Sequence, residues 1–308
     1  MHVAVGSVAA SSGARFWDVV KAYVALTKPR IIELLLVTTA PAMFLAAGGL
    51  PPWELILVVM IGGLFAAASA NTFNCVIDAD IDEVMRRTRR RPVPRHQVST
   101  RNALVFGVVL GILATLVLGF GANWLSAVLA LTANAFYVFV YTMWLKRRTW
   151  QNIVWGGIAG CFPPLIGWTA VTGSIAWPPL ILFAVVFLWT PPHTWALAFR
   201  YRDDYAAAGV PMLPVVSTPP RVAAQIFWYT LATVVVSLLL WPVTPTGPLY
   251  PIVAGVLGVV FLTEAVALWR RARAGAEGPQ LKAMRLFHWS NTYLALLFLA
   301  VAIDPLLF

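Results

Sequence analysis

Polar side chains recur at intervals of four residues in one segment of this sequence. Asn74, Asp78 and Asp82 would form a single stripe on a helix, because four residues rotate the position by only about 40°. Asp80 would point to the opposite side. Carboxylates this close in a poorly hydrated site stay ionised only if a cation compensates them. Such oxygen ligands suit Mg²⁺, which takes one or two carboxylates and completes its shell with phosphate oxygens and water.

A second acidic pair, Asp203 and Asp204, directly follows Arg200 and Arg202, and further basic residues occur within 86–91 and 146–148. This combination is what a metal-bridged diphosphate requires, because Mg²⁺ binds its oxygens while Arg or Lys neutralises its charge as it leaves. We expect metal ligands among Asn74, Asp78, Asp82, Asp203 and Asp204, with Asn74, Asp78, Asp82 and Asp204 acting in catalysis. We expect the diphosphate at Lys28, Arg87, Arg91, Lys146, Arg147 and Arg202.

Each pattern also has a purely structural interpretation. A carboxylate at a helix end is commonly a cap or part of a surface ion pair. An arginine run in a loop commonly marks topology and touches anionic lipid, and we interpret Arg89, Arg90 and Arg95 in this way. For the Asn74, Asp78 and Asp82 stripe we favour a functional role, because ionisable groups within a membrane are costly and are functional by default.

Of the four histidines, His193 is the only one well inside an apolar stretch. It follows Pro191 and Pro192, which we expect to break the local helix. Its imidazole could hydrogen-bond a carbonyl that the prolines leave free, or it could act as a ligand or as an acid or base. The residues alone leave both roles open.

The composition excludes an ordinary water-soluble enzyme. Charged residues make up 11% of the 308 residues and hydrophobic residues 60%, whereas a soluble domain carries roughly 25% charged residues. Two cysteines cannot form a disulfide framework, and we expect Cys75 and Cys161 to be packing residues. The net charge of +10 would suggest nucleic acid in a soluble chain. Here the placement of the charges indicates a protein of the lipid bilayer with no nucleic-acid partner.

Nine hydrophobic stretches are long enough to cross a bilayer, since a spanning helix needs about 20 apolar residues. They lie at 31–50, 55–77, 102–121, 124–144, 151–171, 178–198, 222–242, 250–269 and 286–307.

The 22 Lys and Arg residues all fall before the first span or in alternate loops. By the positive-inside rule, the N-terminus and the charged loops are expected in the cytoplasm, and the C-terminus outside a cell inner or plasma membrane. Residues 1–27 lack the apolar core and cleavage site of a signal peptide, so we expect a short cytoplasmic N-terminal segment before a retained first helix. No internal repeat is visible, and we expect one domain over 1–308.

The ordered motifs resemble the intramembrane prenyltransferases of the UbiA superfamily, and within it the branch that farnesylates haem. Asn74-x3-Asp78-x3-Asp82 is similar to the superfamily's first aspartate motif. The second motif, in many members two aspartates four apart, corresponds here to Tyr201 and Tyr205, which leaves the second set of metal ligands undefined. Further segments that resemble the haem branch are 27–30, 80–94, 141–147, 152–157, 163–168, 190–198 and 204–214.

The resemblance implies an all-α bundle of nine transmembrane helices with its active site on the cytoplasmic side. The expected reaction is Mg²⁺-dependent transfer of farnesyl from farnesyl diphosphate to the vinyl group of haem B, with water addition, giving haem O and diphosphate. His193 and Trp195 are the expected haem-binding residues. A neutral imidazole is the commonest protein ligand of haem iron. The expected partner proteins are haem A synthase or oxidase assembly factors.

Two other functions compete with this interpretation. A sibling enzyme would prenylate a phenolic or quinone-type ring, and only the haem-branch motifs and His193 argue against it. A cation-coupled transporter could also use carboxylates and broken helices at the membrane midplane. The carboxylates here lie at the expected cytoplasmic end of the spans, beside arginines, which favours diphosphate chemistry.

Overall fold

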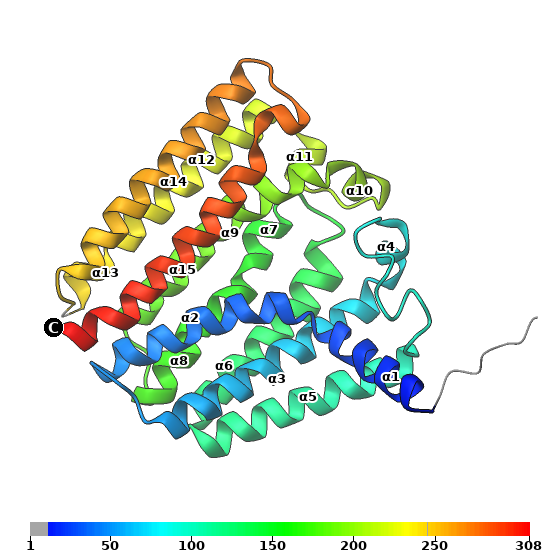
Figure 1. The fold of residues 1–308 in the computed structure, drawn as a ribbon, viewed down its shortest axis with the longest axis horizontal. Coiled ribbons are helices and arrows are strands. Elements are labelled where there is room, and N and C mark those ends of the chain that lie inside the picture. Colours follow the sequence, from blue (N-terminus) through cyan, green and yellow to red (C-terminus); the bar gives the residue numbers. More distant parts are fainter. Residues whose placement is uncertain (1–11, 245) are drawn as a thin grey trace, which may run out of the picture.

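The computed structural model describes residues 12–244 and 246–308, which form a bundle of helices (Figure 1). Within this described part there is no strand, and nine helical segments are long and apolar enough to cross a membrane. These are α2 (Pro29–Ala47), α3 (Trp53–Ile77), α5 (Thr100–Gly121), α6 (Trp124–Ala135) continued by η1 (Phe136–Leu145), α7 (Asn152–Gly156) through η2 (Gly157–Cys161) to α8 (Phe162–Thr172), α9 (Trp177–Arg200), α12 (Pro219–Leu238) with α13 (Leu240–Val243), α14 (Leu249–Arg273) and α15 (Ala283–Leu307).

These segments confirm the predicted all-α, multi-pass architecture. The largest boundary difference is at α14, which continues to Arg273 instead of ending at 269. The first eleven residues of the predicted N-terminal segment 1–27 lie outside the described residues, and the rest forms α1 (Ser12–Thr27). Which side of the membrane each end faces stays a prediction.

The short helices gather at one end of the bundle. Here lie α4 (Ala79–Val84), α10 (Arg202–Ala207) and α11 (Leu213–Val216), while the chain ends at the opposite side, next to α13 (Figure 1). The 3₁₀ turn η3 (Gly278–Leu281) joins α14 to α15. We call the end of the bundle that carries α4, α10 and α11 the charged end.

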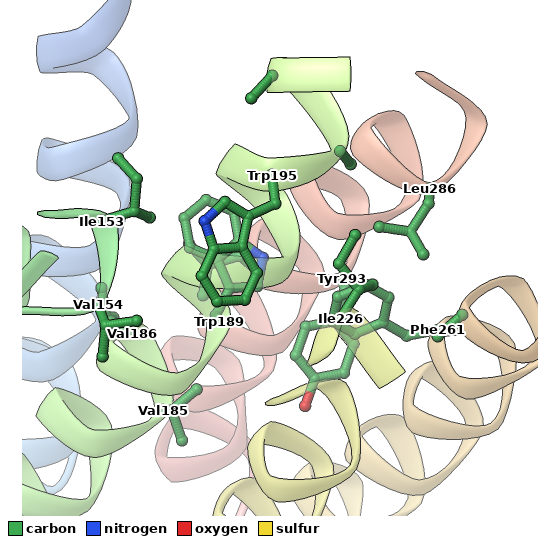
Figure 2. Packing of buried hydrophobic residues seen from close by; sticks show 14 of the residues in the cluster. Ile153, Val154, Val185, Val186, Trp189, Trp195, Ile226, Phe261, Leu286 and Tyr293 are labelled. Carbon is green, nitrogen blue, oxygen red and sulfur yellow. The ribbon is translucent and has the colours of Figure 1, made fainter. Parts of the chain in front are cut away.

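Small residues let the long helices approach closely, as membrane bundles require. Helix α3 packs along α5, α12 packs against α9 and α14, and α15 contacts both α2 and α9. Gly258 of α14 faces Val234 of α12 with no room for a Cβ between them. Aromatic and branched side chains fill the main core, among them Trp189, Trp195 and Tyr293 (Figure 2).

Proline affects the spans less than predicted. Helix α9 runs from Trp177 to Arg200 through Pro191 and Pro192, so the expected break before His193 is wrong. The hydroxyl of Thr190 donates to the carbonyl oxygen of Val186 at 2.8 Å within this stretch. Neighbouring side chains and helices can compensate for the lost backbone donors, which lets a membrane helix continue through proline.

Candidate active site

The predicted stripe forms where α3 meets α4. Asn74 lies in the last turn of α3, Asp78 links the two helices, and Asp82 lies in α4. The backbone bonds continue across the junction: the amide of Asp78 donates to the carbonyl of Asn74 at 3.0 Å, and that of Asp82 to Asp78 at 2.8 Å. The helical register is thus kept, and the structure brings all three side chains, each buried, to one side.

A polar cluster surrounds Asn74. Its amide nitrogen donates to Asp78 Oδ2 at 2.7 Å and to Thr142 Oγ1 at 3.0 Å, and its oxygen accepts from Lys28 Nζ. Lys28 stands between α1 and α2 with a left-handed backbone (φ 54°), directly before Pro29. Burial lowers the pKa of Lys28 to about 8.

Basic side chains neutralise both carboxylates of the stripe. The ammonium of Lys146 pairs with Asp78, and Arg147 Nη2 lies 3.8 Å from the other oxygen, Oδ1. Arg91 Nη1 donates to both oxygens of Asp82, at 2.6 and 2.9 Å. The predicted diphosphate-binding residues Lys28, Arg91, Lys146 and Arg147 therefore converge on the stripe.

Asp80 points away from the stripe, as its helical position predicted. Its side chain is 64% exposed, and both its oxygens accept from Arg147 at 2.7 Å. The hydrogen bonds from Arg147 lower the pKa of Asp80. This pair holds the guanidinium of Arg147 at the rim of the stripe.

A π-helical segment, η1, positions the groups that contact the stripe from the other side. The amide of Lys146 donates to the carbonyl five residues earlier, at Tyr141, over 2.9 Å, and Thr142 Oγ1 donates to Tyr137 at 2.9 Å. Such wide turns often occur at functional sites. Here the wider turn accompanies the simultaneous contact of Thr142 with Asn74 and of Lys146 with Asp78.

The donor set fits a divalent cation only with help from the substrate. In the described part of the chain, no three His, Cys, Asp or Glu side chains lie close enough to hold a metal. Asp78 Oδ1, however, is buried and lacks a hydrogen-bond partner. A buried unpaired carboxylate oxygen is costly, and a cation bound there would satisfy it. Two carboxylates, an amide oxygen and substrate phosphate would suffice for Mg²⁺.

Among the described residues, the second acidic cluster forms no hydrogen bond or ion pair with the side chains of the stripe and contacts Arg87 instead. Asp204 Oδ2 accepts from the backbone amide of Arg87 at 3.3 Å, while Asp203 and Arg202 are exposed. The guanidinium of Arg87 lies 5.3 Å from the ring centre of Tyr201 and 6.0 Å from that of Tyr205. These contacts join the segment after α4 to α10. A pocket of about 380 Å³ opens between α4 and residues 207–210.

An apolar cavity of about 330 Å³ lies between α2, α3, α6, α8 and α9. Its polar lining includes Asn71, one turn before Asn74, and Tyr141, the neighbour of Thr142, so its polar part adjoins the stripe. Tyr141 packs where a Cβ on Gly156 would stand, which requires glycine there. The remaining lining is mostly small or apolar: Ile31, Leu35, Leu36, Gly63, Ala66, Ala67, Ala70, Ala130, Ala133, Ile153, Gly157, Ala159, Gly160, Phe162, Pro163 and Ile166.

His193 lies beside this cavity but does not line it. Thr190 and Thr194 of α9 face the cavity, whereas the imidazole faces α15 and is stacked between two aromatic rings. Trp195 is fully buried in the core (Figure 2). Its ring centre lies 5.6 Å from that of Tyr229, with the two ring planes nearly perpendicular.

Residues 35–291 of the sequence match the UbiA prenyltransferase family. The chain belongs to this family. It is 70% identical over 290 residues to "Protoheme IX farnesyltransferase" of Cutibacterium acnes, covering 94% of this chain and 86% of the relative. It is 55% identical over 303 residues to the protein of that name from Streptomyces coelicolor, covering 98% of this chain and 96% of the relative.

Solved structures of UbiA-type proteins share the fold. A digeranylgeranylglyceryl phosphate synthase structure matches with a TM-score of 0.77 at 18% identity, over 94% of this chain and 99% of that one. A UbiA homologue from Archaeoglobus fulgidus, solved with GPP and Mg²⁺, matches with a TM-score of 0.61 at 16% identity, over 92% and 99%.

This UbiA prenyltransferase also contains site residues that our sequence interpretation did not select. Thr142 holds Asn74, Tyr137 and Tyr141 line the cavity next to it, and Ser290 holds His193. In the sequence, the spacing of four residues between Tyr137 and Tyr141, shortly before Lys146, could have indicated this part of the site. Nothing local in the sequence pointed to Ser290, whose contact with His193 joins residues 97 positions apart.

Proposed function

We propose that this chain transfers the farnesyl group of farnesyl diphosphate to a vinyl group of haem B, with addition of water, giving haem O and diphosphate. One observation carries the chemistry: fully buried Asp78, paired with Lys146 and with one oxygen that accepts no hydrogen bond, adjoins the polar part of an apolar cavity. The acceptor is supported by relatives named "Protoheme IX farnesyltransferase" at 55–70% identity over nearly the whole chain.

Asn74, Asp78 and Asp82 would hold Mg²⁺ together with the diphosphate. A UbiA homologue has been solved with GPP and Mg²⁺, which supports the same metal here. Mg²⁺ would supply charge stabilisation at the diphosphate oxygens as the bond to the prenyl carbon breaks. Lys28, Arg91, Lys146 and Arg147 already contact these three side chains and so can bind the same diphosphate.

The second cluster has a different part in the proposal. Arg87 lies between Tyr201 and Tyr205 and is bonded to Asp204, so it can contact the diphosphate only from the rim. Arg202 and Asp203 are exposed, and they can take part only if substrate draws α10 inward. We assign the chemistry to the stripe and the closing of the site to α10.

The cavity suits the reacting hydrocarbon. When the C1–O bond of farnesyl diphosphate breaks, the electron pair leaves with diphosphate and an allylic cation remains. Water would capture this cation, and a small-residue apolar lining excludes water from it. The vinyl carbon attacks C1, the new cation beside the porphyrin takes up water, and a proton is released. The farnesyl chain and the porphyrin ring are both apolar, so these parts of the substrates can enter from the bilayer.

His193 is the proposed haem ligand on the neighbouring face of α9. Its imidazole is partly exposed and is anchored by α15. Trp195 is enclosed by the core, so we assign to it the support of α9 and not a direct contact with haem. Family membership favours prenyl transfer over cation-coupled transport.

The excess of Lys and Arg at the charged end supports a cytoplasmic site in a cell inner or plasma membrane. Haem O would pass to an enzyme that oxidises it, and we therefore retain haem A synthase or oxidase assembly factors as proposed partners.

The test is product formation by the purified chain in lipid nanodiscs with haem B, farnesyl diphosphate and Mg²⁺. We expect a product with the mass of haem O, containing one ¹⁸O when the reaction runs in H₂¹⁸O. EDTA should stop turnover, and added Mg²⁺ should restore it. Prenylation of 4-hydroxybenzoate, with none of haem, would make the phenolic acceptor the correct function. Full turnover in excess chelator would remove the metal from the proposal.

A further inference from the structure

His193 is held by three contacts with α15 and its own helix. Its ring stacks on Trp189, with 4.2 Å between ring centres and 20° between planes, and on Phe287, at 4.6 Å and 30°. Its Nδ1 lies 2.8 Å from Ser290 Oγ. Trp189 Nε1 donates to the carbonyl oxygen of the same Ser290 at 2.8 Å. Both α9 side chains therefore dock on one residue of α15.

The hydrogen bonds of Ser290 define the tautomer of His193. Ser290 Oγ donates to the carbonyl oxygen of Phe287 at 2.7 Å, and a carbonyl can only accept. A hydroxyl has one proton, so the arrangement in which both contacts are hydrogen bonds has Ser290 Oγ accepting from Nδ1–H of His193. The ring is largely enclosed by aromatic groups, where an uncompensated charge is costly, so the neutral form applies. The lone pair is then on Nε2.

Nε2 is the atom that remains available. Among the described residues it has no hydrogen-bond partner, and it is not fully buried. Histidines that ligate metals generally donate their other ring N–H to an acceptor, which fixes the tautomer and the ring orientation. His193 shows this arrangement, with Ser290 Oγ as the acceptor.

We infer that Ser290 is a positioning residue, which holds His193 as the Nδ1–H tautomer so that Nε2 can ligate the iron of the haem substrate. This inference rests on the proposed haem acceptor. It places the iron on the α15 side of α9. Thr190 and Thr194, which directly follow Trp189 and His193 in the sequence, face the prenyl cavity. One residue turns a helix by about 100°. The two substrates would therefore occupy adjacent faces of α9.

Ser290→Ala tests the inference by removing the acceptor. We expect haem B affinity, measured by Soret titration of the full chain in nanodiscs, to fall about 10- to 100-fold, as for other residues that orient metal ligands. Ser290→Thr keeps the hydroxyl and should bind nearly as wild type. Ser126→Ala is the matched control, because Ser126 is an equally buried serine that bonds Thr169 of another helix pair.

Metal-free protoporphyrin IX separates positioning from packing. It has the same ring but no iron, so Ser290→Ala should leave its affinity unchanged. Equal loss for both porphyrins, or no loss for haem B, would overturn the inference. Haem O formation by the wild type, followed in parallel, shows whether the proposed function stands when the inference fails.

A measurement on the wild type covers the case in which Ser290→Ala does not fold. Resonance Raman spectra of the ferrous haem complex should contain an iron–imidazole stretching band that shifts on ¹⁵N-histidine labelling and disappears in His193→Ala. A wild type that binds haem without this band, or binds no haem, would overturn the ligation. In the first case haem O is still produced, and in the second the proposed function fails with it.

Discussion

Removing the carboxylate of Asp78 separates its part in catalysis from its part in the fold. The side chain of Asp78 has no exposed surface and that of Lys146 is only 13% exposed, so their ion pair is buried. In Asp78→Ala the ammonium of Lys146 keeps its charge but loses its counter-ion, with the guanidinium of Arg147 close by. Breaking a buried pair in this way costs about 3–5 kcal/mol. We expect that loss in the free energy of unfolding.

Lys146→Met in the same chain removes the stranded charge while keeping the apolar stem. The double variant should recover a large part of the stability, because replacing both members of a buried pair by apolar groups is often neutral. Activity should not return. If Asp78 holds the metal and Lys146 the diphosphate, as we propose, losing both contacts removes several kcal/mol of transition-state stabilisation, which corresponds to about 10³-fold in rate.

Stability is measured by tryptophan fluorescence during thermal or denaturant unfolding in detergent, and activity as haem O formed per minute. Asp80→Ala is the matched control for stability. It removes an exposed carboxylate from the same short segment, and exposed pairs contribute about 0–1 kcal/mol. If the double variant regained turnover together with stability, Asp78 would act only as a counter-ion and the catalytic assignment would be wrong. Unchanged stability in Asp78→Ala would refute the buried pair.

Three further changes test the surroundings of the site. Arg91→Ala removes the guanidinium that binds Asp82 and should raise the KM for farnesyl diphosphate at least tenfold. Arg89→Ala, at an exposed position, should leave this KM unchanged. Equal effects of the two changes would mean that the arginines of this loop only mark topology. Gly160→Leu should lower kcat/KM about tenfold for farnesyl diphosphate and less for geranyl diphosphate, because a side chain there projects into open cavity space. If the ratio of kcat/KM for the two donors did not change, the prenyl chain would not bind in this cavity. The hydrogen bonds from Arg147 lower the pKa of Asp80 in the folded state. Their small stabilisation is therefore complete above the unfolded pKa of about 4 and is lost as the pH falls through the folded pKa. The difference in unfolding free energy between wild type and Asp80→Asn should be constant from about pH 5 to 8.

The spans could be predicted because their signal is local. Apolar length determines whether a segment can cross a bilayer, and the structure has its long helices at the predicted places. The stripe of Asn74, Asp78 and Asp82 also follows from local geometry. Its prediction survives the helix junction at Asp78 because the backbone bonds keep a spacing of four residues across it.

The partners of these residues could not be predicted in the same way. Thr142 and Lys146 reach the stripe from the π-helical segment η1, which packs against α3 and α7. The helical register of this segment differs from that of the α-helix that the sequence predicts. Ser290 meets His193 only because α15 packs on α9. Helix α9 also continues through Pro191 and Pro192, because neighbouring helices and side chains in a membrane bundle can compensate for the backbone donors that prolines lack.

The observed ion pairs also explain how carboxylates this close together can be buried. Lys146 neutralises Asp78 and Arg91 neutralises Asp82, so neither carboxylate carries an uncompensated charge. If Mg²⁺ and diphosphate bind here together, as we propose, Asp78 and Asp82 would hold the cation, and Lys146 and Arg91 would be free to bind the diphosphate. Each charged group would then keep an opposite charge beside it. Diphosphate without Mg²⁺ would compete with the carboxylates for the same two side chains, which is why we expect its binding alone to be weak.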